Sequence, residues 1–229
     1  MKEKQKKNIF AVSFCVLLLV TVIGLTIAYL TDRNYVNNVL MIGNVDIQLV
    51  EPDYPNDIES RIMVPYKTIA KNPQLINSGT TDSFVFMELT VPVVNATEIL
   101  SNRTRGTTED REIFKTNVSD SANSAEIGCI TYNSEWVFLS QSSDNTANTR
   151  TYLFGYSGVL APGESTKTLF DSVSLISILE STESANTTKN ITVQGYAIQS
   201  DNIPDINATE TLSRDTLEKV YEVICNQKG

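Results

Sequence analysis

Histidine is absent from the 229 residues of this chain, and cysteine occurs only three times. The lack of histidine excludes Ser-His-Asp triads, Cys-His dyads and the His-x-x-x-His zinc sites of common metallopeptidases. No glycine-rich loop follows a predicted strand, so the usual phosphate-binding fingerprint of a nucleotide site is also missing. Ser165 and Lys167 are close in sequence, but they follow a tight turn and fit the ordinary alternation of a strand. We therefore expect a protein that is not an enzyme and needs no cofactor or metal.

Basic residues are scarce as well. The chain has 18 lysines and arginines against 27 acidic residues, which gives a net charge of −9 at pH 7. Beyond residue 28 the balance is 14 basic against 26 acidic residues, a net charge near −12. This excess disfavours nucleic acid as a partner, because few cations are available to neutralise phosphates. Acidic loop residues such as Asp53, Asp57 and Glu59 follow no calcium-loop pattern, and we interpret them as solvated surface.

A long apolar run, residues 9–30, follows four lysines in the first seven residues. A basic start before an apolar run is typical of an export signal whose basic end stays in the cytoplasm. Small residues end the run, and we predict cleavage between Ala28 and Tyr29, which makes residues 1–28 a signal peptide. The alternative is a membrane anchor formed by residues 9–30, because a helix of that length spans the ~30 Å hydrocarbon core. Either way, the remainder is predicted to be secreted or displayed at the cell surface.

Short alternating or β-branched runs, bounded by turn-forming residues, recur along residues 29–229. They predict one all-β domain, an antiparallel sandwich, with residues 83–91 as a central strand that is limited by Pro92. The predicted strands cover residues 45–50, 61–69, 83–91, 127–131, 135–139, 151–156, 166–175 and 191–199. Pro162 and Gly163 predict a type II turn. A short C-terminal helix is expected from Asp215 onward, with Ser213 as its N-cap.

Cys129 and Cys225 are the only cysteines beyond the export segment. Export permits a disulfide between them, which would pin the C-terminal helix to a strand. Their spacing does not resemble a metal knuckle. The sequence therefore leaves two alternatives open, one bridge or two buried thiols.

Several segments, in order along the chain, carry a family resemblance. They are Thr26-Ile27-Ala28-Tyr29-Leu30-Thr31-Asp32, Asn37-Asn38, Gly43-Asn44-Val45-Asp46-Ile47-Gln48-Leu49-Val50-Glu51-Pro52, Lys71-Asn72-Pro73-Gln74-Leu75-Ile76-Asn77-Ser78-Gly79, Leu160-Ala161-Pro162-Gly163-Glu164-Ser165-Thr166 and Val193-Gln194-Gly195-Tyr196-Ala197-Ile198-Gln199-Ser200. With these segments the chain resembles the TasA and camelysin group of exported Gram-positive proteins, which are cut by a dedicated SipW-type signal peptidase. The N-terminal segment is the most specific of them.

The resemblance implies a jelly-roll sandwich that assembles with copies of itself into extracellular fibres of a biofilm matrix. A SipW-type peptidase and an accessory matrix protein are the implied partners. In such fibres residues 29–42 of one subunit would act as a donor strand that completes the sheet of the next. Physical reasoning supports this, because an extended tail with Tyr29, Val36, Val39 and Leu40 can satisfy an open sheet edge, and head-to-tail addition makes filaments. The alternative is that the segment forms the first strand of its own domain.

Two other functions compete with the fibre hypothesis. One is a camelysin-type surface peptidase, against which the absence of histidine speaks. The other is a carbohydrate-binding or adhesive surface module, because jelly rolls often serve as lectins. Trp136, Tyr152 and Tyr156 would form its aromatic platform, although their positions in predicted strands favour the core.

Overall fold

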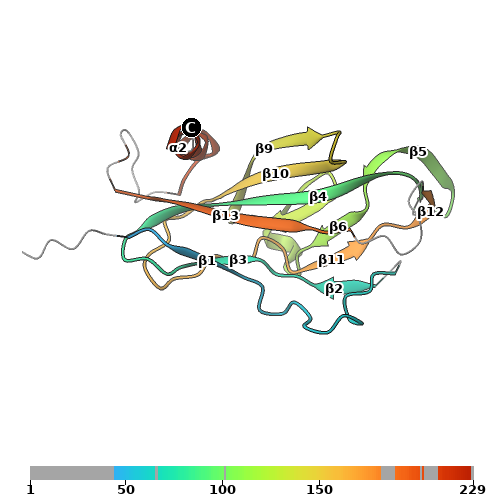
Figure 1. Ribbon diagram of the computed structural model, residues 1–229, viewed down its shortest axis with the longest axis horizontal. Helices are drawn as coiled ribbons and strands as arrows, with labels where there is room; N and C mark the ends of the chain where they lie inside the picture. Colours follow the sequence, from blue (N-terminus) through green and yellow to red (C-terminus); the bar gives the residue numbers. More distant parts are fainter. Residues whose placement is uncertain are drawn as a thin grey trace, which may run out of the picture. The chain divides into compact units, whose positions relative to one another are not determined.

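The alternating runs build an antiparallel, mostly β structure with one helix near the C-terminus, as expected for an all-β sandwich (Figure 1). The computed structural model describes residues 44–64, 67–100, 102–181, 189–201, 203 and 211–227. Gly43–Gly229 forms a compact unit separate from Met1–Ile42. Within the described ranges, no helix combines the length and hydrophobicity needed to cross a membrane.

The elements follow one another in this order: β1 (Ile47–Val50), β2 (Thr68–Ala70), β3 (Gln74–Asn77), β4 (Ser83–Ile99), β5 (Arg105–Glu112), β6 (Phe114–Asn117), the 3-10 turn η1 (Ser121–Asn123), β7 (Ser124–Ile127), β8 (Ile130–Asn133), β9 (Trp136–Asp144), β10 (Thr149–Tyr156), β11 (Ser172–Leu175), β12 (Ile178–Ser181), β13 (Thr192–Gln199) and α2 (Arg214–Gln227).

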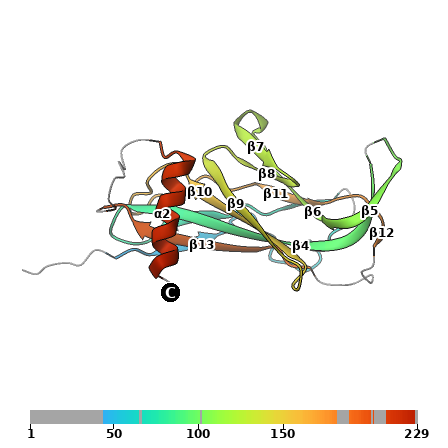
Figure 2. The ribbon, with the colours of Figure 1, turned by 90° about the horizontal axis from the view of Figure 1, so that it is seen from above.

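Strand β4 organises the main sheet and bends along its length (Figure 2). Its first half pairs with both β10 and β13. Because these two strands pair with the same residues of β4, they lie on its opposite edges. Its second half pairs in the same way with β5 and β12. The partners change at Pro92, which has no backbone N–H to donate. Strand β9 extends the sheet beyond β10.

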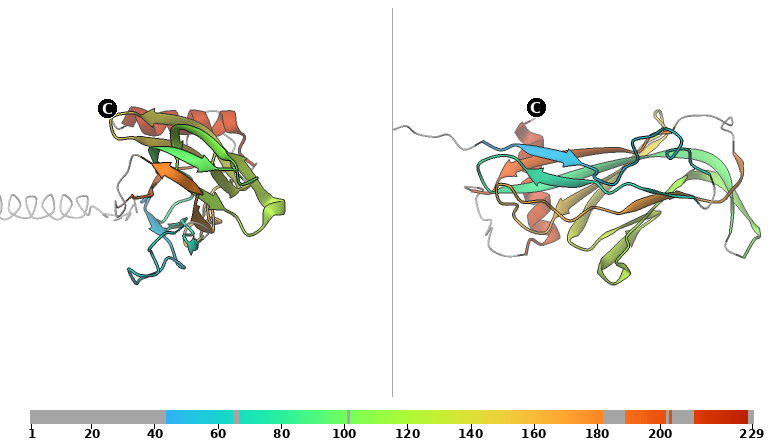
Figure 3. Two further views of the ribbon diagram at one scale, coloured as in Figure 1. Left: turned by 90° about the vertical axis from the view of Figure 1, so that its right-hand side faces the viewer. Right: turned by 90° about the horizontal axis from the view of Figure 1, so that it is seen from below.

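The remaining strands pack on the inner face of the main sheet. β1 pairs with β3, β11 lies between β2 and β6, and β7 forms a hairpin with β8. Figure 3 shows β1 and β3 on the underside of this unit. The core between the two groups contains alternate residues of β4, namely Val85, Met87, Leu89 and Val91, each fully buried. This alternation places successive side chains on opposite faces of the sheet.

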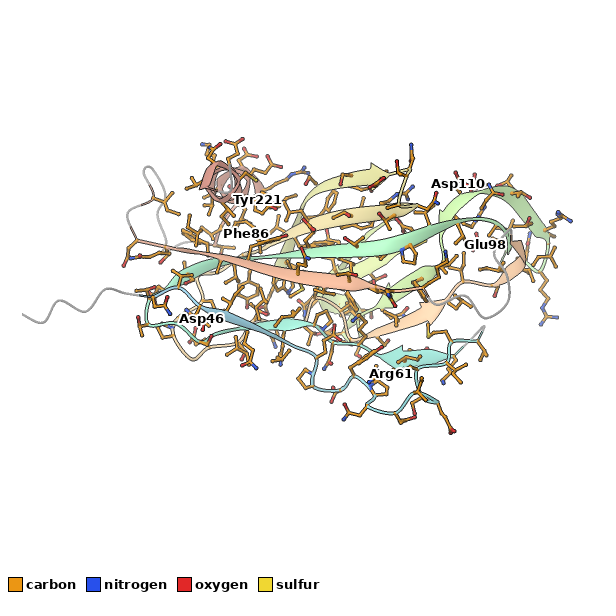
Figure 4. The ribbon with its side chains drawn as sticks, in the orientation of Figure 1. Asp46, Arg61, Phe86, Glu98, Asp110 and Tyr221 are labelled. Carbon is orange, nitrogen blue, oxygen red and sulfur yellow. The ribbon has the colours of Figure 1, made fainter. Side chains whose placement is uncertain are left out.

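Helix α2 covers one end of the outer face of the main sheet (Figure 2). Leu217, Val220 and Ile224 are buried against Phe84 and Phe86, the outward-facing residues at the start of β4. The rings of Phe86 and Tyr221, both labelled in Figure 4, pack at a tilt of 56° with their centroids 5.2 Å apart. Burial of each such side chain contributes about 1.5–3 kcal/mol, which explains why a strand with two apolar faces is stable here.

Most of the predicted elements are confirmed. The structure has β1, the central β4, the β9–β10 hairpin and β13 where the pattern places them. Gly163 has φ +81°, as a type II turn requires, and the Glu164 N–H donates to the carbonyl of Ala161. Ser213 caps α2, since the N–H of Thr216 donates to its hydroxyl at 3.3 Å.

Four strand predictions need correction. Residues 61–64 form a loop rather than a strand, because Arg61 and Lys67 bind loop carbonyls and hold the chain in turns. β4 does not end at Pro92, since the exchange of partner strands accommodates this residue. The predicted strand 127–131 is interrupted by a turn at Gly128, and β5 and β6 precede it in a stretch where the pattern predicts no strand. In the predicted strand 166–175, only Ser172–Leu175 forms a strand.

Candidate functional site

A groove of about 640 Å³ opens between the start of β13 and the strands β1 and β2. Its walls and floor come from segments far apart in the sequence. The lining residues are Leu49, Glu51, Tyr54, Arg61, Met63, Ile69, Lys71, Phe114, Val173, Lys189, Asn190, Ile191, Thr192 and Val193. Eight of these fourteen side chains are apolar or aromatic and six are polar or charged, so the lining is mixed and can contact both apolar side chains and polar groups of a bound segment.

The strands beside the groove each have an edge that no strand of the described residues occupies. β13 pairs with β4 on one edge, and no strand of the described residues pairs with the other. β1 likewise pairs only with β3 among the described strands. Free strand edges expose backbone N–H and C=O groups that an added strand can satisfy. The groove therefore combines apolar side chains with backbone hydrogen-bonding capacity.

Beyond the groove, β1 and β13 approach each other closely at Gly195. A Cβ on this glycine would lie 2.6 Å from Cδ2 of Leu75 and 3.1 Å from Cδ1 of Ile47. The missing side chain thus permits β13 to pack directly against β1 and β3. Toward the start of β13 the space widens, and Val193 and Ile191 are only half-buried there.

The polar floor of the groove is fixed by ion pairing. The Lys71 ammonium donates to the Glu51 carboxylate at 2.5 Å, and the Lys71 side chain is only 10% exposed. The ring of Tyr54 lies between two cations, with Arg61 Cζ at 5.0 Å and Lys71 Nζ at 5.1 Å from its centroid. These cation–π contacts hold the tyrosine in place. In Figure 4, Arg61 marks the loop that forms this wall.

The chain enters β1 at a tightly bonded end of the unit. Asn77 is fully buried, and its side-chain amide donates to the carbonyls of Thr81 and Leu160, both at 2.8 Å. The N–H of Gly79 donates to the Asn77 side chain and to the carbonyl of Asp46. Four of the segments that carry the family resemblance therefore converge in space, at the β1 entry, the 77–79 turn, the 160–164 turn and β13.

A second polar cluster lies in the interior, on β5 and β10. Glu112 is 2% exposed, accepts a hydrogen bond from the Tyr152 hydroxyl and pairs with Arg150 at 3.0 Å. Burial, and then the hydrogen bond to Glu112, raise the pKa of Tyr152 well above its ordinary value. Tyr152 and Arg150 together satisfy the Glu112 carboxylate, whereas Arg150 Nε has no hydrogen-bond partner among the described residues, so the cluster is a buried but incompletely satisfied link between strands.

The residues predicted to act in export and assembly lie outside the described residues. They are Ala28, Tyr29, Val36, Val39 and Leu40. Across the described ranges, no group of three or more acidic or cysteine side chains is placed to hold a metal ion.

Cys129 and Cys225 are free thiols in the structure. Cys129 is half-buried beside Glu112, whereas Cys225 is exposed on α2 near Tyr221. Burial is the main cause that raises the pKa of the Cys129 thiol. Of the two alternatives left by the sequence, the structure has separate thiols, although Cys225 is exposed rather than buried.

The aromatic residues named for a glycan platform belong to the core. Trp136 and Tyr152 are 1% and 0% exposed, and Tyr156 packs edge-on against Trp136. Trp136 and Tyr152 therefore present no aromatic surface to a sugar, and Tyr156 is half-buried.

The sequence did not predict the groove. The residues that line it come from loops and strands that meet only in the fold, and the stretch 49–64 was interpreted partly as a strand. The sequence does contain an indication of the groove, because Leu49, Tyr54 and Met63 are large apolar residues in a segment rich in turn-forming residues. Comparison with models of known protein families, with curated proteins and with solved structures finds no match for this chain.

Proposed function

We propose that this chain is an exported structural subunit of extracellular fibres, assembled by exchange of its N-terminal segment. In this proposal residues 29–42 of one subunit lie in the groove of the next and pair with the start of β13. The observation that carries the proposal is a groove with several apolar side chains, beside two strand edges that no strand of the described residues occupies. The fold would then be a jelly roll that is completed by its neighbour.

The length of the segment fits the groove. Fourteen extended residues span about 45 Å at ~3.3 Å each, whereas the eight residues of β13 need about 26 Å. The segment is therefore long enough to pair with the start of β13, beside the groove, and still reach the next domain. Its apolar side chains, Val36, Val39 and Leu40 among them, match the apolar lining formed by Ile69 and Phe114.

Assembly of this kind is open-ended. The donor segment and the acceptor groove are different surfaces of one chain, so each added subunit offers a fresh groove or a fresh segment. The proposed life cycle is export, removal of residues 1–28 by a SipW-type peptidase, and assembly at the cell surface or in a biofilm matrix, with help from an accessory matrix protein. The resemblance to the TasA and camelysin group supports this cycle.

A binding experiment tests the proposal. A fluorescent peptide of residues 29–42 is titrated into the compact unit, residues 43–229, and followed by anisotropy. The proposal predicts saturable binding that is lost when Val36, Val39 and Leu40 of the peptide are changed to serine. Equal weak binding of both peptides would contradict it.

A further inference from the structure

The loop that walls the groove is unusually apolar on its outer side. The large hydrophobic side chains that are at least 36% exposed number six in the described residues, and four of them lie between residues 49 and 64. Ile58, Ile62 and Val64, here named the apolar loop, are 78%, 59% and 50% exposed. Concentrated exposure of this kind marks an interaction surface rather than scattered surface residues.

The apolar loop has a fixed shape. The Lys67 ammonium donates to the carbonyls of Ser60 and Ile62 at 2.9 and 2.8 Å. The Arg61 guanidinium donates to the carbonyls of Pro55 and Asn56 at 2.7 and 3.1 Å. These bonds hold the turns of the loop, so its aliphatic side chains stay outward instead of folding into the core.

The base of the loop is anchored as well. Asp53 and Asn72 exchange two hydrogen bonds, from the Asp53 N–H to the Asn72 side chain at 3.0 Å and from that side chain back to the Asp53 carboxylate at 2.8 Å. Asn72 is 8% exposed, so this pair is largely shielded from water. The loop therefore presents a prepared surface, for which binding costs little ordering entropy.

We propose that the apolar loop contacts the folded domain of a second copy of this chain, the copy whose residues 29–42 occupy the adjacent groove. This inference rests on the proposed function. The apolar loop and the groove are continuous, because Tyr54, Arg61 and Met63 lie in the same segment of the chain as the apolar loop and also line the groove. A subunit bound in the groove must therefore pass along the loop.

Chain length limits how far away the donor domain can lie. Only residues 43–46 separate the donor segment from β1, which begins at Ile47. Four residues span at most about 14 Å, so the donor domain begins within that distance of the end of its bound segment. The apolar loop adjoins the groove and is therefore a hydrophobic surface within reach of that domain. Such a contact would fix the angle between consecutive subunits and make the fibre stiff.

Charge argues against a membrane as the occupant. The loop carries three carboxylates, Asp53, Asp57 and Glu59, against the two cations Arg61 and Lys67, so its net charge is slightly negative. A surface with this balance gains no electrostatic attraction to anionic lipid headgroups. A second copy supplies apolar surface without the need for that attraction.

The test uses the double variant Ile58→Ser and Ile62→Ser in the chain that begins at Tyr29. Leu179→Ser is the matched control, because Leu179 is 48% exposed on β12 outside the loop. Assembly is followed by light scattering and electron microscopy, and affinity for the 29–42 peptide is measured in the 43–229 unit carrying the same changes. Circular dichroism verifies that each variant is folded.

We expect the 43–229 unit with the double change to bind the peptide with a Kd within twofold of that of the unchanged unit. The chain that begins at Tyr29 should lose most of its fibre mass when it carries the double change, whereas the same chain with Leu179→Ser should assemble normally. Normal fibres from the double variant would overturn the role of the loop and leave the proposed function intact. Loss of peptide binding in the double variant would also overturn it, since the loop would then act only by shaping the groove. If the unchanged unit fails to bind peptide, the proposed function falls, and this inference with it.

Discussion

Gly79 lies directly against the backbone of Asn44, at the point where the chain enters the sandwich. A Cβ on Gly79 would also lie 2.8 Å from the amide nitrogen of Asp46. The approach is close because the N–H of Gly79 donates to the carbonyl of Asp46 and the N–H of Thr80 to that of Asn44. This turn fixes the position from which the N-terminal segment leaves the domain.

Gly79→Ala should destabilise the domain by several kcal/mol, because the added methyl meets backbone atoms that cannot move without loss of these hydrogen bonds. Gly158→Ala is the matched control, since its Cβ meets only the Tyr156 ring at an ordinary 3.6 Å. Urea unfolding of both variants gives the comparison. Equal stability of the two variants would show that the entry to β1 is not rigid.

Asn77→Ala should also destabilise the domain, because the carbonyls of Thr81 and Leu160 and the N–H of Gly79 would each lose one hydrogen bond, although each keeps another partner. The net contribution of one such hydrogen bond to stability is about 0.5–1.5 kcal/mol. Chemical denaturation measures the loss. A change below about 0.5 kcal/mol would mean that water replaces the amide, and that Asn77 does not organise this end of the domain.

The sequence predicted what depends on local pattern. Alternating residues marked β13, and the apolar stripe of Leu217, Val220 and Ile224 marked α2. It failed where long-range pairing overrides local composition. β5 is a charged segment that becomes a strand because β4 continues past Pro92 and offers it an edge. The groove could not be predicted, since it exists only between strands that meet after folding.

Leu49→Lys should weaken binding of the 29–42 peptide at least tenfold without unfolding the domain. Leu49 lines the groove and is already 36% exposed, so the lysine ammonium can remain solvated, yet an apolar contact to the peptide is lost. Leu179→Lys provides the control for an added charge at an exposed leucine. Unchanged peptide affinity in Leu49→Lys would place the binding site elsewhere.

Tyr156→Phe should reduce the loss of stability at alkaline pH. Burial, and then the hydrogen bond to the Glu135 carboxylate at 2.7 Å, raise the pKa of Tyr156 to about 12. The unfolded chain ionises this tyrosine near pH 10, so the stabilisation is complete below pH 10 and is lost as the pH rises toward 12. Urea unfolding between pH 9 and 12 should give a shallower decline for the variant. Parallel curves would contradict the assignment.

Thiol labelling should distinguish the two cysteines of the processed chain. Cys225 is exposed and should react quickly, whereas burial and a raised pKa slow Cys129 by at least ~10-fold. Without reductant, the unfolded protein should show two free thiols. A count of zero would mean that Cys129 and Cys225 form the disulfide after all.

Electron microscopy of the chain that begins at Tyr29, beside one that lacks residues 29–41, tests the central claim most directly. The account predicts filaments from the first and only monomers from the second, with both folded by circular dichroism. Monomers from both chains at high concentration would contradict self-assembly through this segment. Such a result would favour the alternative in which residues 29–42 complete the sheet of their own domain.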